Sequence, residues 1–183
     1  MSDFKSARRL DELGRVVIPK EIRRACRIRG GDLLQISIIE EKVCLEKYSP
    51  IKDLGTFAKD FVDALSKATS KHVLITDTKE VIAVNKLKKE YLNKSITDEF
   101  TNVIENGKSL LLNKADGGDT VKVFDGSPET FAELIVPVTT DGAVIGGVVV
   151  FSEDKGEKIE RPDIVATTFG ARFLEKQFDV KND

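Results

Sequence analysis

The sequence predicts an α+β fold in two domains, on three observations. Strand-like alternation and helix-like periods both occur along the chain, a proline-containing linker interrupts them at residues 48–54, and the net charge changes sign across that linker. With 183 residues, the chain is long enough for one large domain or two small ones. We therefore expect a basic N-terminal domain at residues 1–47 and a larger α+β domain at residues 55–183.

Charge is distributed unevenly between these two parts. Residues 1–47 contain 11 Lys and Arg against 8 Asp and Glu, a net charge of +3, and the remainder carries −5, which gives the −2 of the whole chain. Seven of the nine arginines lie in the first part. This asymmetry predicts an anionic partner for the N-terminal domain.

Short elements are expected in the N-terminal domain. Gly14 permits a tight turn, and residues 15–18 are typical of a short β-branched strand that ends at Pro19. Because proline also presets the φ angle of a first helical residue, residues 19–28 are expected to form a helix that stops before two glycines. At 100° per residue, the arginines of that helix share one side and its apolar residues share the other.

A hairpin with one apolar face is expected next. Apolar residues alternate with polar ones over residues 34–38, a charged turn follows at residues 40–42, and the alternation resumes at Val43 and Leu45. A module of 47 residues has difficulty burying enough apolar surface by itself. We therefore expect two chains to share one core. The two cysteines, Cys26 and Cys44, have no CxxC spacing and are expected to be buried, reduced thiols.

The run R-R-L-D-E-L-G-R-V-V-I-P-K-E-I-R-R, from Arg8 to Arg24, resembles the signature of the AbrB-like transition-state regulators. The resemblance implies a dimeric swapped-hairpin β-barrel in which the arginines of both subunits form one surface for double-stranded DNA. Arg8, Arg15, Arg23 and Arg24 fall on the DNA-contacting positions of the family motif. By position and charge we add Arg9, Lys20 and Arg27. Lys5-Ser6-Ala7 stands where the family usually has an apolar Gly-Ile-Val, so the first strand is expected to be short or frayed.

The second domain alternates helical and extended segments. Apolar residues at spacings of three and four predict a helix from about Asp53 to Thr69, and further helices are expected near residues 96–106, capped by Ser95 or Thr97, and at about 162–178. Strands are expected at residues 72–77, 81–85, 110–113, 120–124, 133–139 and 144–152, with Thr140-Asp141-Gly142 as a hairpin turn between the last two.

The run E-L-I-V-P-V-T-T-D-G-A-V-I-G-G-V-V-V-F, from Glu133 to Phe151, resembles the end of a GAF domain. This resemblance implies a GAF-like α/β sandwich, a fold that often senses small molecules. Both cysteines precede it, so no covalent chromophore and no cofactor are expected. An AbrB-like head with a GAF-like body is similar to regulators of sporulation genes, which implies a tetramer of two dimers joined by the C-terminal domains. The same resemblance implies that the protein is located in the cytoplasm, at the nucleoid of the forespore.

Other functions fit the sequence less well. One histidine, His72, and two cysteines are too few for a zinc site, and they specify no catalytic nucleophile with its base, so no enzyme is expected. No stretch approaches the roughly 20 apolar residues of a membrane helix. The alternative is a MazE-like antitoxin, which would bind operator DNA with the same head and a toxin with its tail. A body that only assembles four heads, and senses nothing, also stays open.

Overall fold

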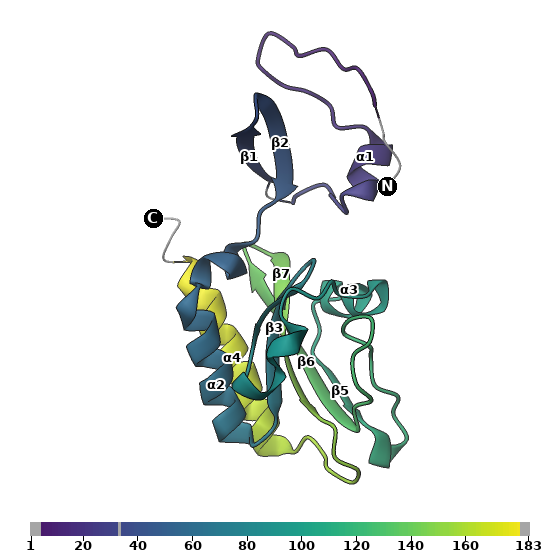
Figure 1. Ribbon diagram of the computed structural model, residues 1–183, viewed down its shortest axis with the longest axis vertical. Coiled ribbons are helices and arrows are strands. Elements are labelled where there is room, and N and C mark those ends of the chain that lie inside the picture. Colours follow the sequence, from purple (N-terminus) through teal and green to yellow (C-terminus); the bar gives the residue numbers. More distant parts are fainter. Residues whose placement is uncertain (1–4, 33, 180–183) are drawn as a thin grey trace. The chain divides into compact units, whose positions relative to one another are not determined.

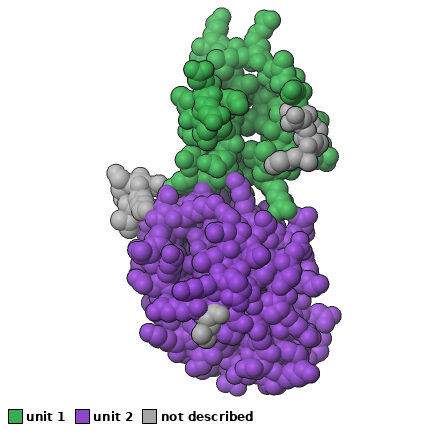
Figure 2. Space-filling view, viewed as in Figure 1, with its two compact units in different colours: residues 1–48 green, residues 49–183 purple. Residues whose placement is uncertain are grey.

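The computed structural model describes residues 5–32 and 34–179. The chain divides into two compact units, residues 1–48 and residues 49–183, which Figure 2 shows in different colours. The first unit contains a short helix and a two-stranded sheet, and the second contains a five-stranded sheet with helices (Figure 1).

Unit 1 contains the predicted hairpin. Strands β1 (Leu34–Ile39) and β2 (Lys42–Lys47) pair antiparallel, with Ile36 opposite Leu45 and Ile38 opposite Val43. The turn consists of Glu40 and Glu41, whose φ angles of 48° and 64° match the positive values of a two-residue hairpin turn. The hairpin therefore places one set of apolar side chains on a single face of the ribbon.

The predicted strand at residues 15–18 is wrong for the single chain, because these residues form no strand. A strand needs a neighbouring edge that offers backbone hydrogen bonds, and in the described part of unit 1 β1 and β2 pair only with each other. The sequence pattern at residues 15–18 is strand-like, but one copy of the chain offers it no pairing edge.

Helix α1 (Lys20–Ala25) begins one residue after the predicted start, with Pro19 as its N-cap, and ends earlier than the predicted Ile28. Arg27 takes a left-handed φ of 54°, the Ile28 N–H donates to the Arg23 carbonyl at 2.7 Å, and the Arg27 N–H donates to the Arg24 carbonyl at 3.1 Å. These are the two hydrogen bonds of a Schellman motif, and Ile28, the residue after the left-handed one, is buried. The helix thus stops at its cap, before the glycines are reached.

Unit 1 has almost no interior of its own. Among its described residues Ile28 alone is buried, while apolar side chains such as Val17, Ile38 and Val43 are more than two-thirds exposed. The predicted burial of both cysteines is also wrong for the single chain, since Cys26 is exposed and Cys44 is half-buried. The apolar residues that were expected to form a core therefore lie on the surface of one copy.

Unit 2 is built around one antiparallel sheet with the strand order β4-β3-β7-β6-β5. Its strands are β3 (His72–Asp77), β4 (Val81–Val84), β5 (Leu110–Asn113), β6 (Ala132–Thr140) and β7 (Ala143–Ser152). Its helices are α2 (Thr56–Thr69), α3 (Asp98–Glu105) and α4 (Arg161–Asp179), with short 3-10 turns η1 (Pro50–Leu54), η2 (Lys86–Tyr91) and η3 (Lys114–Asp116). Helices α2 and α4 lie side by side against one face of the sheet (Figure 1).

The strands send alternate side chains to two apolar layers. On β7, Val148 and Val150 face α2 and α4, whereas Val149 and Phe151 face α3 and the loop before β6. The same alternation on β6 places Glu133 on the α3 side, directly opposite Phe151. One acidic side chain therefore points into an otherwise apolar layer.

The sequence predicted most elements of unit 2 closely. The strands at residues 72–77 and 110–113 have the predicted bounds, the hairpin turn lies at Asp141 and Gly142, and the Thr97 hydroxyl caps α3 by accepting the Phe100 N–H at 3.0 Å. The predicted strand at residues 120–124 is wrong, because this segment makes only an isolated bridge between Phe124 and Ile96. Its apolar residues follow a strand-like pattern because they fill the α3-side layer from a loop.

The segment predicted as a linker, residues 48–54, includes η1, which packs on the sheet of unit 2. Ile51 is fully buried in the layer under α2 and α4. A Cβ atom built on Gly146 of β7 would lie 2.6 Å from Ile51 Cδ1 and 2.0 Å from the Thr76 carbonyl oxygen. Because Gly146 has no side chain, the side chain of Ile51 can pack directly against β7 at this position. Where the functional domains begin and end stays a prediction.

Candidate functional site

The seven cationic residues predicted to contact DNA all lie in unit 1. Six of them are exposed and Arg23 is half-buried. Two precede the first turn, one closes that turn, three lie on α1 and one caps its C-terminal end: Arg8, Arg9, Arg15, Lys20, Arg23, Arg24 and Arg27.

The turn before α1 is organised by one carboxylate. Asp11 Oδ1 accepts the N–H groups of Leu13 and Arg15, at 3.0 and 2.8 Å, and its Oδ2 accepts Nε of Arg15 at 2.8 Å. These hydrogen bonds from Arg15 lower the pKa of Asp11 below its usual value. Gly14, with a φ of 75°, completes the turn where a side chain would be strained. The guanidinium of Arg15 is thereby held by its own turn.

Helix α1 gathers a second group of cations. Lys20, Arg23 and Arg24 are spaced by three and four residues, so they share one side of the helix. Arg27 follows in the Schellman cap, at a left-handed backbone position that a side chain with a Cβ rarely takes. Placing an arginine where glycine is favoured costs about 1 kcal/mol of conformational energy. Such local strain is often associated with a functional side chain.

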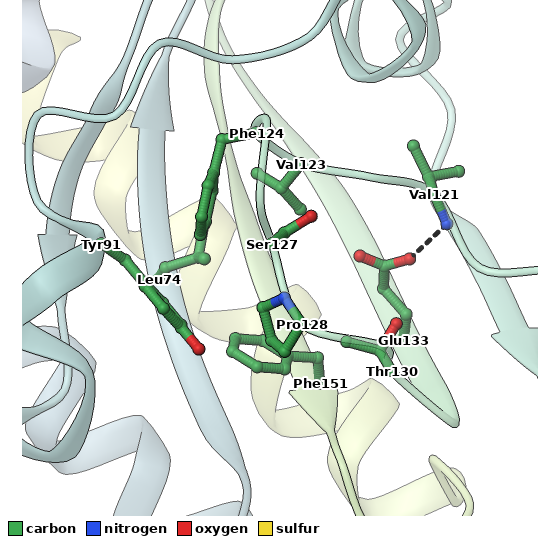
Figure 3. Close-up of a pocket in the computed structure, with 10 residues that line it drawn as sticks. All are labelled: Leu74, Tyr91, Val121, Val123, Phe124, Ser127, Pro128, Thr130, Glu133 and Phe151. Atoms are coloured by element: carbon green, nitrogen blue, oxygen red, sulfur yellow. Dashed lines mark hydrogen bonds between the residues drawn. The ribbon is translucent and has the colours of Figure 1, made fainter.

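Unit 2 contains a second candidate site, a pocket on the α3 side of the sheet. About 250 Å³ of empty space, counted with its open side, lies among residues from β3, η2, the loop before β6, β6 and β7 (Figure 3). The lining residues are Leu74, Tyr91, Val121, Val123, Phe124, Ser127, Pro128, Thr130, Glu133 and Phe151. Most of this lining is apolar.

Glu133 is the buried acidic group of this pocket. Its side chain is 1% exposed, and its Oε2 accepts the Val121 N–H at 2.9 Å. Its other oxygen, Oε1, has no hydrogen-bond partner among the described residues. Burial, reinforced by the negative charge of Glu99, raises the pKa of Glu133 to about 7. A buried polar oxygen without a partner costs about 1–3 kcal/mol, so this position calls for an explanation.

Glu133 was not among the site residues expected from the sequence. The signal that marks it is one acidic residue inside the run A-E-L-I-V-P-V, where every neighbour is apolar. Carboxylates are almost never fully buried without a partner. A single acidic residue in a central strand is therefore a sign of a site.

His72 and the described acids form no further site. The ring of His72 packs on Phe151 with its centroid at 5.3 Å, and burial lowers the pKa of this histidine. Over residues 5–32 and 34–179, no three His, Cys, Asp or Glu side chains come together as metal ligands. The described helices include none that is both long and apolar enough to cross a membrane.

Comparison with known families decides where the chain belongs. Residues 53–179 match the family profile described as "Stage V sporulation protein T C-terminal, transcription factor", and residues 7–53 match "Antidote-toxin recognition MazE, bacterial antitoxin". The chain is also 42% identical over 173 residues to stage V sporulation protein T of Bacillus subtilis (strain 168), covering 92% of this chain and 96% of that protein. The chain belongs to the stage V sporulation protein T family.

Within this family the two units have separate relatives. The transition state regulatory protein AbrB of Bacillus subtilis (strain 168) is 41% identical over 75 residues, which is 41% of this chain and 78% of AbrB. A solved GAF domain, from a phosphoenolpyruvate-protein phosphotransferase of Coxiella burnetii, covers 70% of this chain and 84% of its own with a TM-score of 0.56 at 16% identity. The predicted fold class, an AbrB-like head and a GAF-like body, is therefore confirmed.

Proposed function

We propose that this protein is a DNA-binding transcription regulator of sporulation genes. One observation carries the proposal: a unit of 48 residues with a net positive charge and an AbrB-like sequence is joined to a body that belongs to a family of sporulation transcription factors. Its partner is double-stranded DNA, its location is the nucleoid of the cytoplasm, and its cell type is the forespore.

The seven cations of unit 1 are the proposed contacts to DNA. Guanidinium groups stay charged at all physiological pH values, form paired hydrogen bonds with phosphate and also reach guanine edges in the major groove. If a dimer neutralises six to ten phosphates, log K falls with log salt at a slope of roughly −5 to −9. Most of the affinity therefore depends on salt, while sequence preference comes from fewer contacts.

The hairpin of unit 1 is the proposed dimer interface. Ile36, Ile38 and Val43 occupy one face of it, and each is at least 69% exposed in the single chain. Burying an apolar side chain of this size contributes about 1.5–3 kcal/mol. A second copy of the same hairpin supplies that cover and also the pairing edge that residues 15–18 lack, which is the swapped arrangement implied by the AbrB resemblance.

Helix α4 carries the proposed contact between dimers. Val165, Phe169 and Phe173 recur every four residues and are 61%, 72% and 45% exposed. Phe169 and Phe173 stack with ring centroids 6.5 Å apart, and Phe57 of α2 lies against Phe173 at 6.1 Å. An apolar stripe of this kind on two adjacent helices suits packing against the same helices of a second dimer. The proposed assembly is a tetramer.

Unit 2 has a second proposed role, which is to sense a small molecule. Its likeness in fold to GAF domains supports it. No catalytic function is proposed, because the family is one of transcription factors. If unit 2 binds no ligand in the cell, it only joins four heads and raises their DNA affinity by multivalency.

The antitoxin alternative rests on the MazE match at residues 7–53, which covers the DNA-binding head. A toxin-binding tail is typically short and folds on its partner. The segment that follows this head is a sheet domain with its own buried layers. The regulator is therefore the better-supported function, and the toxin-binding role has no described residue in unit 2 to support it.

The proposed DNA contact is tested by R23A/R24A in the full chain. We expect this variant to lose a gel shift on operator DNA while its circular dichroism and oligomeric mass stay unchanged. K42A/R161A removes two positive charges from exposed positions outside the proposed surface and is expected to bind as the parent does. Equal binding by R23A/R24A and the control contradicts the assignment of these arginines.

A further inference from the structure

The pocket of unit 2 contains two buried oxygen atoms that lack hydrogen-bond partners among the described residues, Glu133 Oε1 and Ser127 Oγ. In Figure 3 the free oxygen of Glu133 points away from Val121 and toward the side of the pocket where Ser127 lies. The enclosed space has room for about one water molecule, which is too little for an organic ligand. The explanation for the buried acid is therefore sought in the carboxyl group and its surroundings.

The surroundings of Glu133 on the sheet are apolar. Leu112 of β5 and Phe151 of β7 lie opposite it, and the described pocket lining contains no Lys, Arg or His side chain. Among the described residues, Val121 alone donates a hydrogen bond to this carboxyl group. An ionised carboxylate accepts about four hydrogen bonds, so a single donor leaves most of its charge unsolvated. A neutral carboxyl group suits this position better.

The titratable groups around Glu133 also oppose its ionisation. Glu99 of α3 places a second negative charge nearby. Tyr91 of η2 donates its hydroxyl to Glu153 at 3.4 Å, and Glu153 also pairs with Lys88 at 2.8 Å, so the charge of that lysine is already neutralised. A protonated Glu133 is therefore the form that its neighbours favour. The charged residues of the loop before β6 are exposed to water: Asp119, Lys122, Asp125 and Glu129.

A proton on Glu133 also accounts for the second unpartnered oxygen. The protonated carboxyl group has one O–H donor, and the Ser127 hydroxyl oxygen is an acceptor. The space between them accommodates one bridging water molecule, which accepts from Glu133 and donates to Ser127. Ionisation of Glu133 removes this donor and leaves a buried charge.

The loop before β6, residues 117–131, covers Glu133. This loop is fastened to α3 by Thr97, whose N–H donates to the Val123 carbonyl at 3.0 Å and whose hydroxyl donates to the Lys122 carbonyl at 2.6 Å. Glu133 itself lies on β6, which pairs with a strand on each side. The loop, rather than the strand, is therefore the part that moves when water reaches Glu133. It supplies six of the ten lining residues: Val121, Val123, Phe124, Ser127, Pro128 and Thr130.

We propose that Glu133 and the loop at residues 117–131 form a pH-sensitive switch, in which the loop is closed over a protonated Glu133 and opens to water when this side chain ionises. The switch belongs to unit 2 alone. It goes beyond the DNA-binding function and does not depend on it.

The direction of the switch follows from linkage. The pKa of Glu133 is about 7 with the loop closed, and exposure to water returns it toward its ordinary value of 4.5, so opening releases a proton. Between these two values each unit of pH favours opening by up to tenfold. Above pH 7 the closed form is ionised as well, and the effect levels off. Acid therefore closes the loop and neutral pH loosens it.

Hydrogen exchange of the full-length protein, followed by mass spectrometry from pH 5 to pH 8, tests this switch. Protection is corrected for the intrinsic exchange rate of each amide. We expect the loop to lose protection at least tenfold between pH 5 and pH 7 and less than threefold between pH 7 and pH 8. The turn η1, where the Gly55 N–H donates to the Lys52 carbonyl at 3.3 Å, packs on the other face of the sheet and is expected to keep its protection.

Variants then assign the effect to one carboxyl group. In E133Q the side-chain amide is a permanent donor in place of the protonated carboxyl group, so the loop is expected to keep its pH 5 protection up to pH 8. D125N makes the same change from carboxylate to amide at an exposed position of the same loop and is expected to follow the parent. The pH profile of the unmodified protein decides the issue even if E133Q folds poorly.

Three results overturn the proposal. The first is loop protection that stays constant from pH 5 to pH 7, and the second is an equal pH dependence in E133Q. The third is loop protection equal to that of β7 at every pH, because the loop then opens only when the whole domain unfolds. DNA binding by unit 1 is measured separately by the gel shift, and its outcome leaves this test unaffected.

Discussion

Nε of Arg15 donates to Oδ2 of Asp11 at 2.8 Å, and the same carboxylate accepts the backbone N–H of Arg15. Both side chains are well exposed, 73% and 42%. In water such a pair contributes little to stability, so its effect is to fix the direction of a guanidinium. Asp11 thus orients one cation of the proposed DNA-binding surface.

D11A is therefore expected to weaken DNA binding even though it removes a negative charge from the head. E12A, which removes the same charge from the exposed neighbour, is expected to bind as tightly as the parent or slightly more so. Fluorescence anisotropy on one duplex, at fixed salt, measures both. If D11A binds like E12A, Asp11 has no role in positioning Arg15.

Arg27 allows conformation and charge to be separated. R27G and R27A remove the same cation, but only glycine takes the left-handed φ of 54° without strain. R27G is expected to be more stable than R27A by about 1 kcal/mol in denaturant titrations. Both are expected to reduce the salt slope of DNA binding equally, by about 0.9 for each phosphate that is no longer neutralised. An unchanged slope in both variants removes Arg27 from the proposed DNA surface.

Phe169 tests the proposed tetramer. F169E places a charge in the exposed stripe of α4 and is expected to convert a tetramer into dimers, as seen by native mass spectrometry. Since Phe169 is 72% exposed in the single chain, the fold of unit 2 is expected to survive. N102E adds the same charge to an exposed position of α3 and serves as the control. A tetramer that persists in F169E places the contact elsewhere.

Glu133 is expected to make stability fall with rising pH. Its pKa is about 7 in the folded chain and 4.5 when unfolded, so between these values the folded state holds one more proton than the unfolded state. By linkage, the stabilisation is complete below pH 4.5, is lost as pH rises toward 7, and totals about 3 kcal/mol.

Urea titrations of the unmodified protein and of E133Q, from pH 5 to pH 8, measure this effect. The lowered pKa of His72 acts in the opposite direction, because its contribution is lost as pH falls. The difference between the two proteins isolates Glu133, since His72 is common to both. Parallel curves would show that Glu133 is already ionised when folded.

Gly146 is expected to be the least replaceable glycine of β7. In G146A the new methyl group meets the Thr76 carbonyl and Ile51, and the expected loss of stability is about 3 kcal/mol. G147A alters the adjacent residue on the opposite face, where the nearest atom is a side-chain methyl of Ile104 at 3.1 Å, so a smaller loss is expected. Thermal unfolding compares them, and equal losses would show that both η1 and the backbone of β3 at Thr76 adapt.

The periodicity of unit 2 was enough to predict its fold, because its sheet closes its own layers within one chain. The pattern misled at residues 120–124, where a loop fills the core with strand-like residues, and at residues 15–18, where the pairing edge is missing from one copy. Arg27 gives no sequence signal of a left-handed cap, since glycine is the expected residue there. The pocket was also missed, because a single Glu133 forms no motif.

The nearly absent interior of unit 1 has a consequence for gene control. A head that acquires a core only when two chains meet forms in proportion to the square of the chain concentration while the chains are scarce. A modest increase in synthesis of the chain therefore gives a steeper increase in the concentration of folded dimeric N-terminal domains. For the proposed dimeric head, gene dosage and protein turnover thus become part of the regulation.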